Sequence, residues 1–390
     1  MTQLSTTIKL PRADGTLYAY TPGKAGYLAP PPHHARSRVA IAAVHVVADP
    51  VAPNGPADPA RLDWDATMAY RRHLWSYGLG VAEAMDTAQR GMGLDWSVAR
   101  ELIARSIAEA RDAGGLVVSG AGTDQLDRGE ARSLADVERA YAEQCEWVES
   151  HGGRVVLMAS RELARIARGP DDYAAIYRKI LGGLALPALI HWLGEVFDPA
   201  LRGYWGHDDL DAAMDVCVEV IAENRAKVDG VKISLLDANR EIAMRRRLPD
   251  GVRMYTGDDF NFAELIAGDE RGHSDALLGI LDAIAPAAAH ALLALDAGEL
   301  ERYHSILAPT VPFSRHVFAA PTYFYKTGIV FMAHLNGHQP HFRMIGGQES
   351  ARSAVHLSEL FVLADRARLL RDPESAVQRM RWFLAQSGIA

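Results

Sequence analysis

The stretch Val228-Asp229-Gly230-Val231-Lys232-Ile233-Ser234 reads as a short strand that is buried on both faces. Because side chains alternate along a strand, Val231 and Ile233 face one apolar layer, and Lys232 faces the opposite, interior side. Burial of an unpaired lysine is unfavourable and lowers its pKa, and a neutral amine in a pocket forms Schiff bases with carbonyl compounds. The chain contains only six lysines, so a lysine inside a core strand predicts a chemical role.

Similar short apolar runs recur along the chain, and helix-sized segments separate most of them. The runs are Val39–Val47, Gly80–Met85, Gly115–Ser119, Arg154–Ala159, Pro187–Trp192, Gly230–Ser234, Val252–Thr256 and Ala276–Leu281. The helical segments are Asp65–Tyr77, Trp96–Ala113, Ser133–Ser150, Asp171–Leu184, Leu210–Lys227, Asn239–Leu248 and Phe260–Ala267. Strands that are apolar throughout and alternate with helices are typical of a parallel sheet covered by helices, and eight such units fit a (β/α)8 TIM barrel. The first run lacks a following GxGxxG loop, which argues against a dinucleotide-binding sheet.

The sequence predicts three parts. Residues 1–37 form an N-terminal arm or hairpin, because residues 8–20 alternate around the turn signal Ala13-Asp14-Gly15. Residues 38–285 form the barrel. Residues 286–390 form a C-terminal helical region packed on the barrel, with the helical segments Pro286–Ala297, Glu299–Leu307, Tyr323–Leu335, Glu349–Ala364 and Pro373–Gln386.

Composition excludes several classes of function. The 390-residue chain has a formal net charge of −8 and no basic cluster interleaved with aromatic residues, so nucleic-acid binding is not expected. No apolar run approaches the ~20 residues that span a bilayer, and the sequence does not begin with a secretion signal. We therefore expect a cytoplasmic protein without membrane contact. Cys145 and Cys217 lie in amphipathic helical patterns and read as small buried hydrophobes.

Polar residues gather at the carboxyl ends of the predicted strands, where barrels place their active sites. In chain order they are Asp86, Thr87, Thr123, Asp124, Ser160, Arg161, His191, Trp192, Glu195, Lys232, Ser234, Asp258 and Asp259. Such a rim predicts a small-molecule site. Structural alternatives stay open for some of these residues. Asp258 and Asp259 follow a glycine and are also typical of a turn and a helix cap. A buried ion pair with Glu83 or Asp258 would also account for Lys232.

Three stretches carry a resemblance to a known family. Val228-Asp229-Gly230-Val231-Lys232, followed by Tyr255-Thr256-Gly257-Asp258-Asp259, resembles the sixth and seventh strands of the dihydrodipicolinate synthase and N-acetylneuraminate lyase superfamily. In that family a G-[IV]-K strand carries the Schiff-base lysine. Leu186-Pro187-Ala188-Leu189-Ile190-His191 is similar to the family's fifth strand, which usually reads L-P-x-[IL]-L-Y-N. The resemblance extends over residues 38–365, and the chain is identified as a divergent branch of the kind grouped as a domain of unknown function.

The resemblance implies a class I lyase or aldolase. Lys232 would attack a substrate carbonyl, and the resulting iminium would act as electron sink for C–C cleavage, condensation or dehydration. We expect His191 to move protons, with Ser160 as a relay. The residues expected to bind substrate are Asp86, Thr87, Arg161, Asp258 and Asp259. The expected partner is a small keto-acid or keto-sugar, no cofactor is expected, and the resemblance implies a homo-oligomer, either a dimer or a tetramer.

The chain departs from the family in the residues that handle pyruvate. The family's second strand ends in a G-T-T-G-E loop that holds the keto-acid carboxylate. This chain has Met85-Asp86-Thr87-Ala88-Gln89 there, and Asp86 would repel a carboxylate. The family's fourth strand carries a catalytic tyrosine, and Met158-Ala159-Ser160-Arg161 contains none. We therefore expect a hydroxyl-rich keto-sugar, or a keto-acid whose carboxylate is placed differently and bound by Arg161.

The sequence leaves two other functions open. Glu83, Asp86, His191, Glu195 and Asp258 offer oxygen ligands and one imidazole, which suit Mg²⁺ or Mn²⁺ in a sugar isomerase or epimerase. Replacement of the tyrosine and of most of the carboxylate loop also fits a barrel that binds a ligand without catalysis.

Overall fold

The computed structural model describes residues 7–126 and 128–389, and eight of its strands close into a parallel barrel. The strands are β3 (Ala40–Ala43), β4 (Gly80–Glu83), β5 (Val117–Ala121), β6 (Arg154–Leu157), β7 (Ala188–Leu193), β8 (Val228–Ser234), β9 (Arg253–Thr256) and β10 (Asp275–Leu278). Each strand pairs with its neighbours in chain order, and β10 closes the ring against β3, with Ala276 opposite Ala40. The predicted (β/α)8 TIM barrel is confirmed, and each predicted apolar run overlaps one of these strands.

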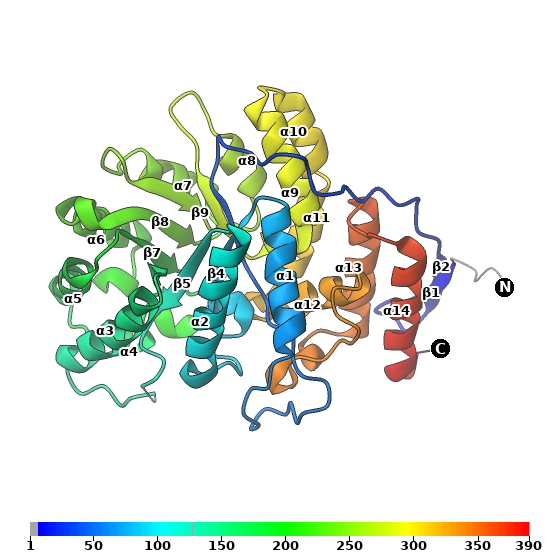
Figure 1. The fold of residues 1–390 in the computed structure, drawn as a ribbon, viewed down its shortest axis with the longest axis horizontal. Helices are drawn as coiled ribbons and strands as arrows, with labels where there is room; N and C mark the ends of the chain where they lie inside the picture. The colour runs from blue at the N-terminus through cyan, green and yellow to red at the C-terminus, as the bar shows by residue number, and fades with distance from the viewer. Residues whose placement is uncertain (1–6, 127, 390) are drawn as a thin grey trace. The chain divides into compact units, whose positions relative to one another are not determined.

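Each barrel strand is followed along the chain by at least one helix. The helices between β4 and β10 are α2 (Trp96–Ala113), α3 (Leu134–Ser150), α4 (Arg161–Ile166), α5 (Pro170–Gly183), α6 (Leu210–Glu223), α7 (Ala238–Arg245) and α8 (Phe262–Ala267). Local sequence sets their ends: Asp95 caps α2 by accepting from the backbone nitrogen of Val98, and Ser133 forms a capping box with Asp136 at the start of α3. Figure 1 shows α3, α5 and α6 on the outside of the barrel strands. The sequence interpretation missed α4, because six residues are too few to show helical periodicity.

One apolar cluster fills the interior of the barrel. Its buried members come from every strand except β8 or from the residues just after them: Ile41, Ala43, Ala82, Met85, Val118, Val156, Leu189, Tyr255 and Leu277. In place of a side chain, β8 contributes Gly230. A Cβ atom there would lie 2.6 Å from Cε2 of Tyr255, so the glycine leaves room for the tyrosine ring. These residues mark which positions along each strand point inward.

Contacts between residues divide the chain into two compact units, which are described separately. The barrel unit comprises residues 38–44 and 79–279 and holds all eight barrel strands. The second unit comprises residues up to 37, 45–78 and 280 onward. The predicted division into 1–37, 38–285 and 286–390 stays an interpretation; residues 1–6, 127 and 390 of these parts lie outside the described residues. Over the described part of the chain, no helix combines the length and the apolar character needed to cross a membrane.

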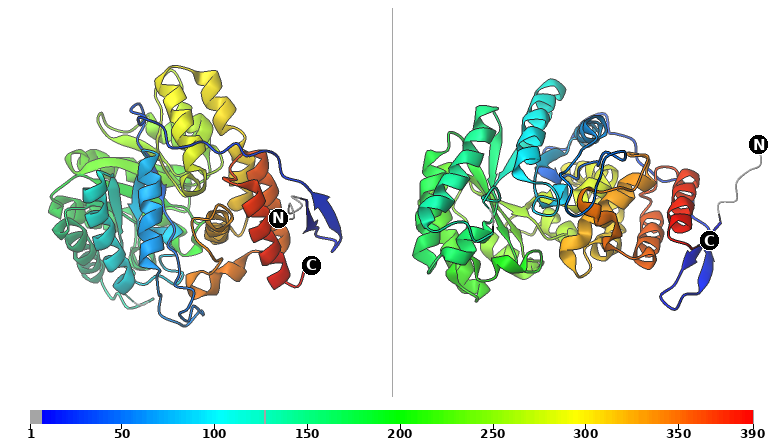
Figure 2. Two further views of the ribbon diagram at one scale, coloured as in Figure 1. Left: turned by 45° about the vertical axis from the view of Figure 1, so that its right-hand side comes forward. Right: turned by 90° about the horizontal axis from the view of Figure 1, so that it is seen from below.

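The second unit contains the N-terminal hairpin and the C-terminal helices. As predicted, β1 (Ile8–Pro11) and β2 (Leu17–Tyr20) pair antiparallel around the turn. The helices are α1 (Trp64–Ser76), α9 (Ile280–Asp296), α10 (Leu300–Leu307), α11 (Thr310–Val317), α12 (Tyr325–Leu335), α13 (Ala354–Arg366) and α14 (Pro373–Gln386). Every residue of α12 is buried, as its apolar sequence requires. The hairpin lies at the side of the C-terminal helices (Figure 2) and contacts α13. There the Tyr20 hydroxyl and the Gly23 backbone N–H donate to Asp365.

Three C-terminal helices differ from the prediction, and one of them is α13, which begins at Ala354 and not at Glu349. The prediction began a helix at Pro286, whereas α9 begins at Ile280 and encloses that proline. Ile284 has non-helical dihedral angles (φ −115°, ψ 17°), so the helix is kinked where the proline lacks an N–H. The sequence interpretation also missed α11, whose eight residues follow α10 after a short turn.

Candidate active site

Lys232 points into the barrel from the middle of β8. It lies two residues after Gly230, so strand alternation places its side chain on the same interior side as that glycine. Its neighbours in register are His191 of β7 and Tyr255 of β9. The residue is 4% exposed, so the predicted burial of a lysine in a core strand is observed.

Gly257 allows the lysine side chain to pass the end of β9. A Cβ atom at this position would lie 2.8 Å from Cε of Lys232 and would clash with the Ile233 carbonyl oxygen and with Oγ of Ser234. Backbone and side chains of β8 therefore occupy the space that any larger residue needs. The glycine of the Gly257-Asp258-Asp259 motif is thus explained by a close approach to the lysine.

Two carboxylates attract the Lys232 amine electrostatically, one from a residue before it in the sequence and one from a residue after it. Asp86 begins the 3₁₀ turn η1 (Asp86–Ala88), shortly after β4, and Asp259 follows β9; Asp259 is buried. Burial lowers the pKa of Lys232 below its ordinary value, and attraction to Asp86 and Asp259 opposes this effect. The amine is therefore easier to deprotonate than the amine of a surface lysine. The negative charges of Asp86 and Asp259 would stabilise a cation formed on the lysine nitrogen.

His191 supplies a neutral imidazole next to the lysine. It follows Leu189 by two residues and so shares the interior side of β7, and its Nε2 lies 3.2 Å from Oγ of Ser234. Burial lowers the pKa of His191 well below its ordinary value, and the positive charge of Lys232 lowers it further, while Asp86 opposes the shift. A neutral imidazole can accept a proton, which is the chemistry that the sequence predicted for His191.

Ser160 lies at the same end of the barrel but is tied to the fold by several hydrogen bonds. Its Oγ caps α4 by accepting from the Leu163 backbone nitrogen (3.0 Å), and it lies 2.6 Å from Oγ1 of Thr123. Its backbone N–H donates to the hydroxyl of Tyr204 (3.1 Å), which in turn lies 3.0 Å from the hydroxyl of Tyr177. These bonds show a structural role, and the role of Ser160 as a proton relay stays a prediction.

The remaining predicted substrate-binding residues have different surroundings. Both carboxylate oxygens of Asp258 accept hydrogen bonds from the turn before α8: Oδ1 from the backbone nitrogens of Phe260 and Asn261, and Oδ2 from the Asn261 side chain. This is the turn-capping role named as the alternative. The guanidinium of Arg161 is half exposed and pairs with Asp198 at 2.5 Å. Thr87 is fully buried within η1.

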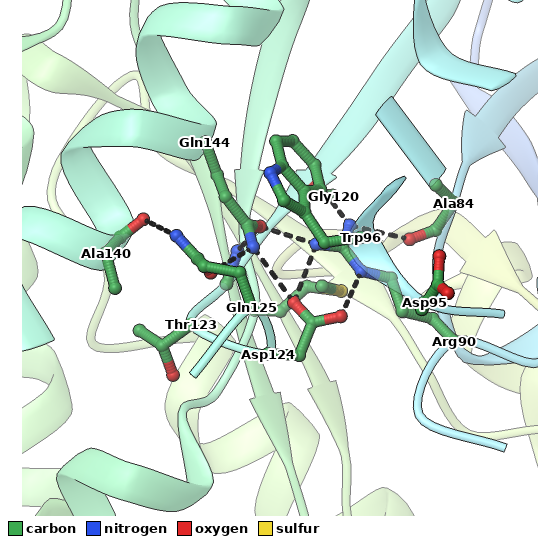
Figure 3. A network of polar contacts seen from close by, with 12 residues as sticks. Ala84, Arg90, Asp95, Trp96, Gly120, Thr123, Asp124, Gln125, Ala140 and Gln144 are labelled. Carbon is green, nitrogen blue, oxygen red and sulfur yellow. Dashed lines mark hydrogen bonds and ion pairs between the residues drawn. The ribbon is translucent and has the colours of Figure 1, made fainter. Parts of the chain in front are cut away.

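A buried arginine that the sequence interpretation did not anticipate connects the ends of β4 and β5 (Figure 3). Nε and Nη2 of Arg90 donate to the carboxylate of Asp124 (2.8 and 2.7 Å), and Nη1 donates to the carbonyls of Ala84 and Gly120. Nη2 also donates to Oε1 of Gln144 at 2.5 Å. All its donor groups are used inside the protein, so Arg90 holds the loops rather than a ligand. Its partners lie up to 54 residues away, so no local sequence signal reveals them.

The structure does not bring together the five residues considered for a divalent metal. Glu83 follows the inward-facing Ala82 and therefore points outward, where it accepts a hydrogen bond from Ser106 of α2. The Glu195 side chain is 65% exposed and lies 3.9 Å from Arg202. Among the residues that the structure describes, no three His, Cys, Asp or Glu side chains gather as a metal site. The ion pair considered between Lys232 and Glu83 is excluded by the same outward orientation.

A family model described as "Protein of unknown function (DUF993)" matches residues 8–389 of this sequence. The chain belongs to this family. The match covers both compact units, hairpin and C-terminal helices included. A comparison with curated proteins gives no match.

Solved structures with the same fold carry the name that the sequence resemblance predicted. A putative dihydrodipicolinate synthetase from Pseudomonas aeruginosa is 15% identical, with a TM-score of 0.64 over 85% of this chain and 100% of that chain. A prophage protein of the dihydrodipicolinic acid synthase family from E. coli K12, solved with pyruvate, is 14% identical, with a TM-score of 0.64 over 91% and 99%. Dihydrodipicolinate synthase from Thermotoga maritima is 14% identical, with a TM-score of 0.59 over 90% and 99%. At these identities the likeness shows the fold, and at that level the predicted resemblance is confirmed.

Proposed function

We propose that this chain is a Schiff-base-forming lyase or aldolase that acts on a small keto-acid or keto-sugar by C–C cleavage, condensation or dehydration. The observation that carries the proposal is the amine of Lys232, which is buried inside the barrel, has a lowered pKa and lies under the influence of two carboxylates. A lysine in such surroundings is a nucleophile at a pH where surface lysines are protonated.

The neighbouring groups suit the steps that follow attack. His191 is neutral and can take the proton that is released when a substrate C–H or O–H bond breaks. The carboxylates of Asp86 and Asp259 can stabilise the positively charged iminium and accept hydrogen bonds from substrate hydroxyls. The fold shared with dihydrodipicolinate synthases, one of them solved with pyruvate, supports carbonyl chemistry in this barrel.

Reductive trapping tests the proposal. The full chain is incubated with a panel of small keto-acids, keto-sugars and aldehydes in the presence of cyanoborohydride, and adducts are located by peptide mass spectrometry. We expect an adduct on Lys232 with at least one compound, and its loss in Lys232→Arg. Lys179→Arg is the matched control, because the Lys179 side chain is 62% exposed on α5. A broad panel that leaves Lys232 unmodified while surface lysines react would refute the proposal.

Two properties implied by the sequence also stay proposals. We propose that the chain assembles into a homo-oligomer, a dimer or a tetramer, and that it works in the cytoplasm. Light scattering coupled to size-exclusion chromatography tests the first, because a monomer and a tetramer of a 42.5 kDa chain are readily distinguished. Cell fractionation of the tagged full chain tests the second.

A further inference from the structure

Ser234 is the only hydrogen-bond partner of the His191 ring in the described part of the chain. Its Oγ lies 3.2 Å from Nε2 of His191, and both residues are 2% exposed. Ser234 follows Lys232 by two residues, so strand alternation places both side chains on the interior side of β8. On β7, His191 is the register neighbour of Lys232. The amine, the hydroxyl and the imidazole therefore come from inward positions of two adjacent strands.

The buried serine indicates which nitrogen of His191 carries the proton. Burial keeps the ring neutral, because it lowers the pKa of His191, so only one ring nitrogen is protonated. If that nitrogen were Nε2, it would donate to Ser234, and the hydroxyl proton would have no acceptor within residues 7–126 and 128–389, which is unfavourable for a buried donor. If the proton is on Nδ1, the hydroxyl donates to the lone pair of Nε2 and is satisfied. Nδ1 also lacks a partner among the described residues but is not enclosed, so its N–H is left for a ligand or for water.

Gly257 leaves the Ser234 hydroxyl close to the end of the lysine side chain. The point that a Cβ atom of Gly257 would occupy lies 2.3 Å from Oγ of Ser234 and 2.8 Å from Cε of Lys232. Both atoms therefore border the space left by one missing side chain, and the amine nitrogen is one bond beyond Cε. A hydroxyl in this place can take a proton from the lysine nitrogen and pass its own proton to His191.

We propose that Ser234 holds His191 in the tautomer protonated at Nδ1 and relays a proton between the attacking Lys232 nitrogen and this imidazole. The relay rests on the proposed function and adds Ser234 to its catalytic residues. When the amine nitrogen forms its bond to the carbonyl carbon, the π electrons of the C=O bond move to the oxygen. His191 gives the Nδ1 proton to that oxygen, Nε2 takes the hydroxyl proton of Ser234, and Ser234 takes a proton from the lysine nitrogen. The product is a neutral carbinolamine, and His191 is left able to accept a proton at Nδ1 in a later step.

NMR of the full chain labelled with ¹⁵N-histidine tests the tautomer. Protonated and unprotonated ring nitrogens resonate far apart, and the signals of His191 are those that disappear in His191→Gln. We expect Nδ1 to be protonated in the wild type and in Ser234→Thr, which keeps the hydroxyl. In Ser234→Ala the proton should move to Nε2 in a large share of the molecules, because nothing then donates to that nitrogen. Ser119→Ala is the matched control, since Ser119 is a buried serine of β5 whose hydroxyl has no described partner, and it should leave the His191 signals unchanged.

The rate of reductive trapping tests the relay. The full chain is incubated with the panel compound that labels Lys232 best, and cyanoborohydride is present at a concentration that no longer limits the rate. The initial rate of adduct formation on Lys232 is divided by the rate on exposed Lys179. We expect this ratio to fall at least about tenfold in Ser234→Ala and to stay near the wild-type value in Ser234→Thr and Ser119→Ala. Urea unfolding midpoints show whether each variant is folded.

The possible results separate this inference from the proposed function. A wild-type His191 protonated at Nε2, or a tautomer that Ser234→Ala leaves unchanged, would overturn the assignment even if Lys232 is labelled. An unchanged trapping rate in Ser234→Ala would overturn the relay, and the Schiff-base function would stand. If no compound labels Lys232, the proposed function fails and the relay fails with it, whereas the NMR result still decides the tautomer. The wild-type spectrum decides the tautomer even if Ser234→Ala does not fold.

Discussion

Lys232 experiences two opposing influences, and their balance sets when its amine becomes reactive. Burial removes water from the ammonium and lowers its pKa, whereas Asp86 and Asp259 favour the charged form. His191 is kept neutral by the same burial and by the charge of Lys232. The site therefore contains one easily deprotonated amine, one neutral base and two anions, which is a set suited to forming and holding an iminium.

The pH dependence of trapping reports this balance. Because the amine reacts in its neutral form, adduct formation at Lys232 should rise with pH and level off at a lower pH than at exposed Lys179. Asp86→Asn removes an attraction that raises the pKa of Lys232, so its profile should move to lower pH. The measurement is adduct yield at each residue across pH 6–10 with one neutral ketone. Coincident profiles at Lys232 and Lys179 would show that burial does not tune the amine.

Gly257 predicts a stability effect that is separable from chemistry. Gly257→Ala places a Cβ against the Ile233 carbonyl oxygen, which cannot move without disturbing β8, so we expect about 1–3 kcal/mol of destabilisation. Gly182→Ala in α5 is the matched control: a Cβ there meets nothing within 4 Å, and helix propensity should make it stabilising by about 0.5–1 kcal/mol. Urea unfolding midpoints measure both, and an unchanged midpoint for Gly257→Ala would contradict the proposed close approach.

The positions of the candidate site residues were predictable where side-chain direction follows from strand alternation. Lys232 was identified because it interrupts an apolar strand at an inward position. His191 was identified from its place at the carboxyl end of the fifth predicted strand and from the family resemblance, and strand alternation explains why it also points inward. Glu83 also lies in a strand, but it comes directly after the inward-facing Ala82 and therefore points outward, towards Ser106 of α2. The role of Asp258 was not decidable, because turn capping and ligand binding use the same residue type at the same place. The guanidinium of Arg161 pairs with Asp198, which lies 37 residues further along the chain, and no local sequence pattern indicates this partner.

Helix α7 carries a buried carboxyl group that ties stability to pH. Glu241 is 1% exposed and accepts a hydrogen bond from Ser274 at 2.7 Å. Burial raises the pKa of Glu241 from 4.5 to about 8. The native state therefore keeps a proton that the unfolded chain releases above pH 4.5. The stabilisation is fully present below pH 4.5 and is lost as the pH rises towards 8.

Glu241→Gln should remove this dependence. The amide has the size of the acid but does not titrate, so the free energy of unfolding should fall with pH between 4.5 and 8 less steeply than in the wild type. The difference in slope should reach about 1.4 kcal/mol per pH unit. Urea unfolding at several pH values measures it. Glu219→Gln, at an exposed position of α6, should leave the slope unchanged, and equal slopes for wild type and Glu241→Gln would count against the assignment.

The hairpin of β1 and β2 depends on one carboxylate of α13. Asp365 accepts from the Tyr20 hydroxyl at 2.5 Å and from the Gly23 backbone N–H at 3.1 Å. Asp365→Ala removes both acceptors, and hydrogen bonds to charged groups contribute about 1.5–3 kcal/mol, so amide exchange across residues 8–20 should accelerate at least tenfold. Tyr20→Phe removes one bond and should have a smaller effect. Unchanged exchange in Asp365→Ala would show that apolar packing alone holds the hairpin.

Long elements were easier to predict from sequence than short or interrupted ones. Trp96–Ala113 and Pro373–Gln386 were predicted with their observed bounds, because each shows several turns of apolar periodicity and begins after an aspartate that caps the helix. The six-residue α4 was missed, and Pro286 was taken as a first helical residue although α9 continues through it with a kink. Tertiary packing, rather than local preference, decides these cases.

Across the whole molecule, the alternation of apolar strands and helices was enough to predict the barrel. The same alternation does not indicate how the chain divides into compact units. The barrel unit begins at residue 38 but excludes residues 45–78, and the second unit begins again at residue 280. Chain order alone suggests that each unit is one continuous stretch of sequence. The contacts among residues show instead that β3, the first barrel strand, and α1, the helix after it, belong to different units.

The pairing of β3 with β10 has a consequence for biosynthesis. Ala40 of β3 pairs with Ala276 of β10, so β3 leaves the ribosome long before β10 has been translated. At about 5–20 residues per second this interval is on the order of ten to fifty seconds, during which one edge of the growing sheet is open. An unpaired apolar strand edge can pair with the edges of other nascent chains. We therefore expect the yield of folded protein in cells to depend on chaperones that cover this edge until translation passes residue 278.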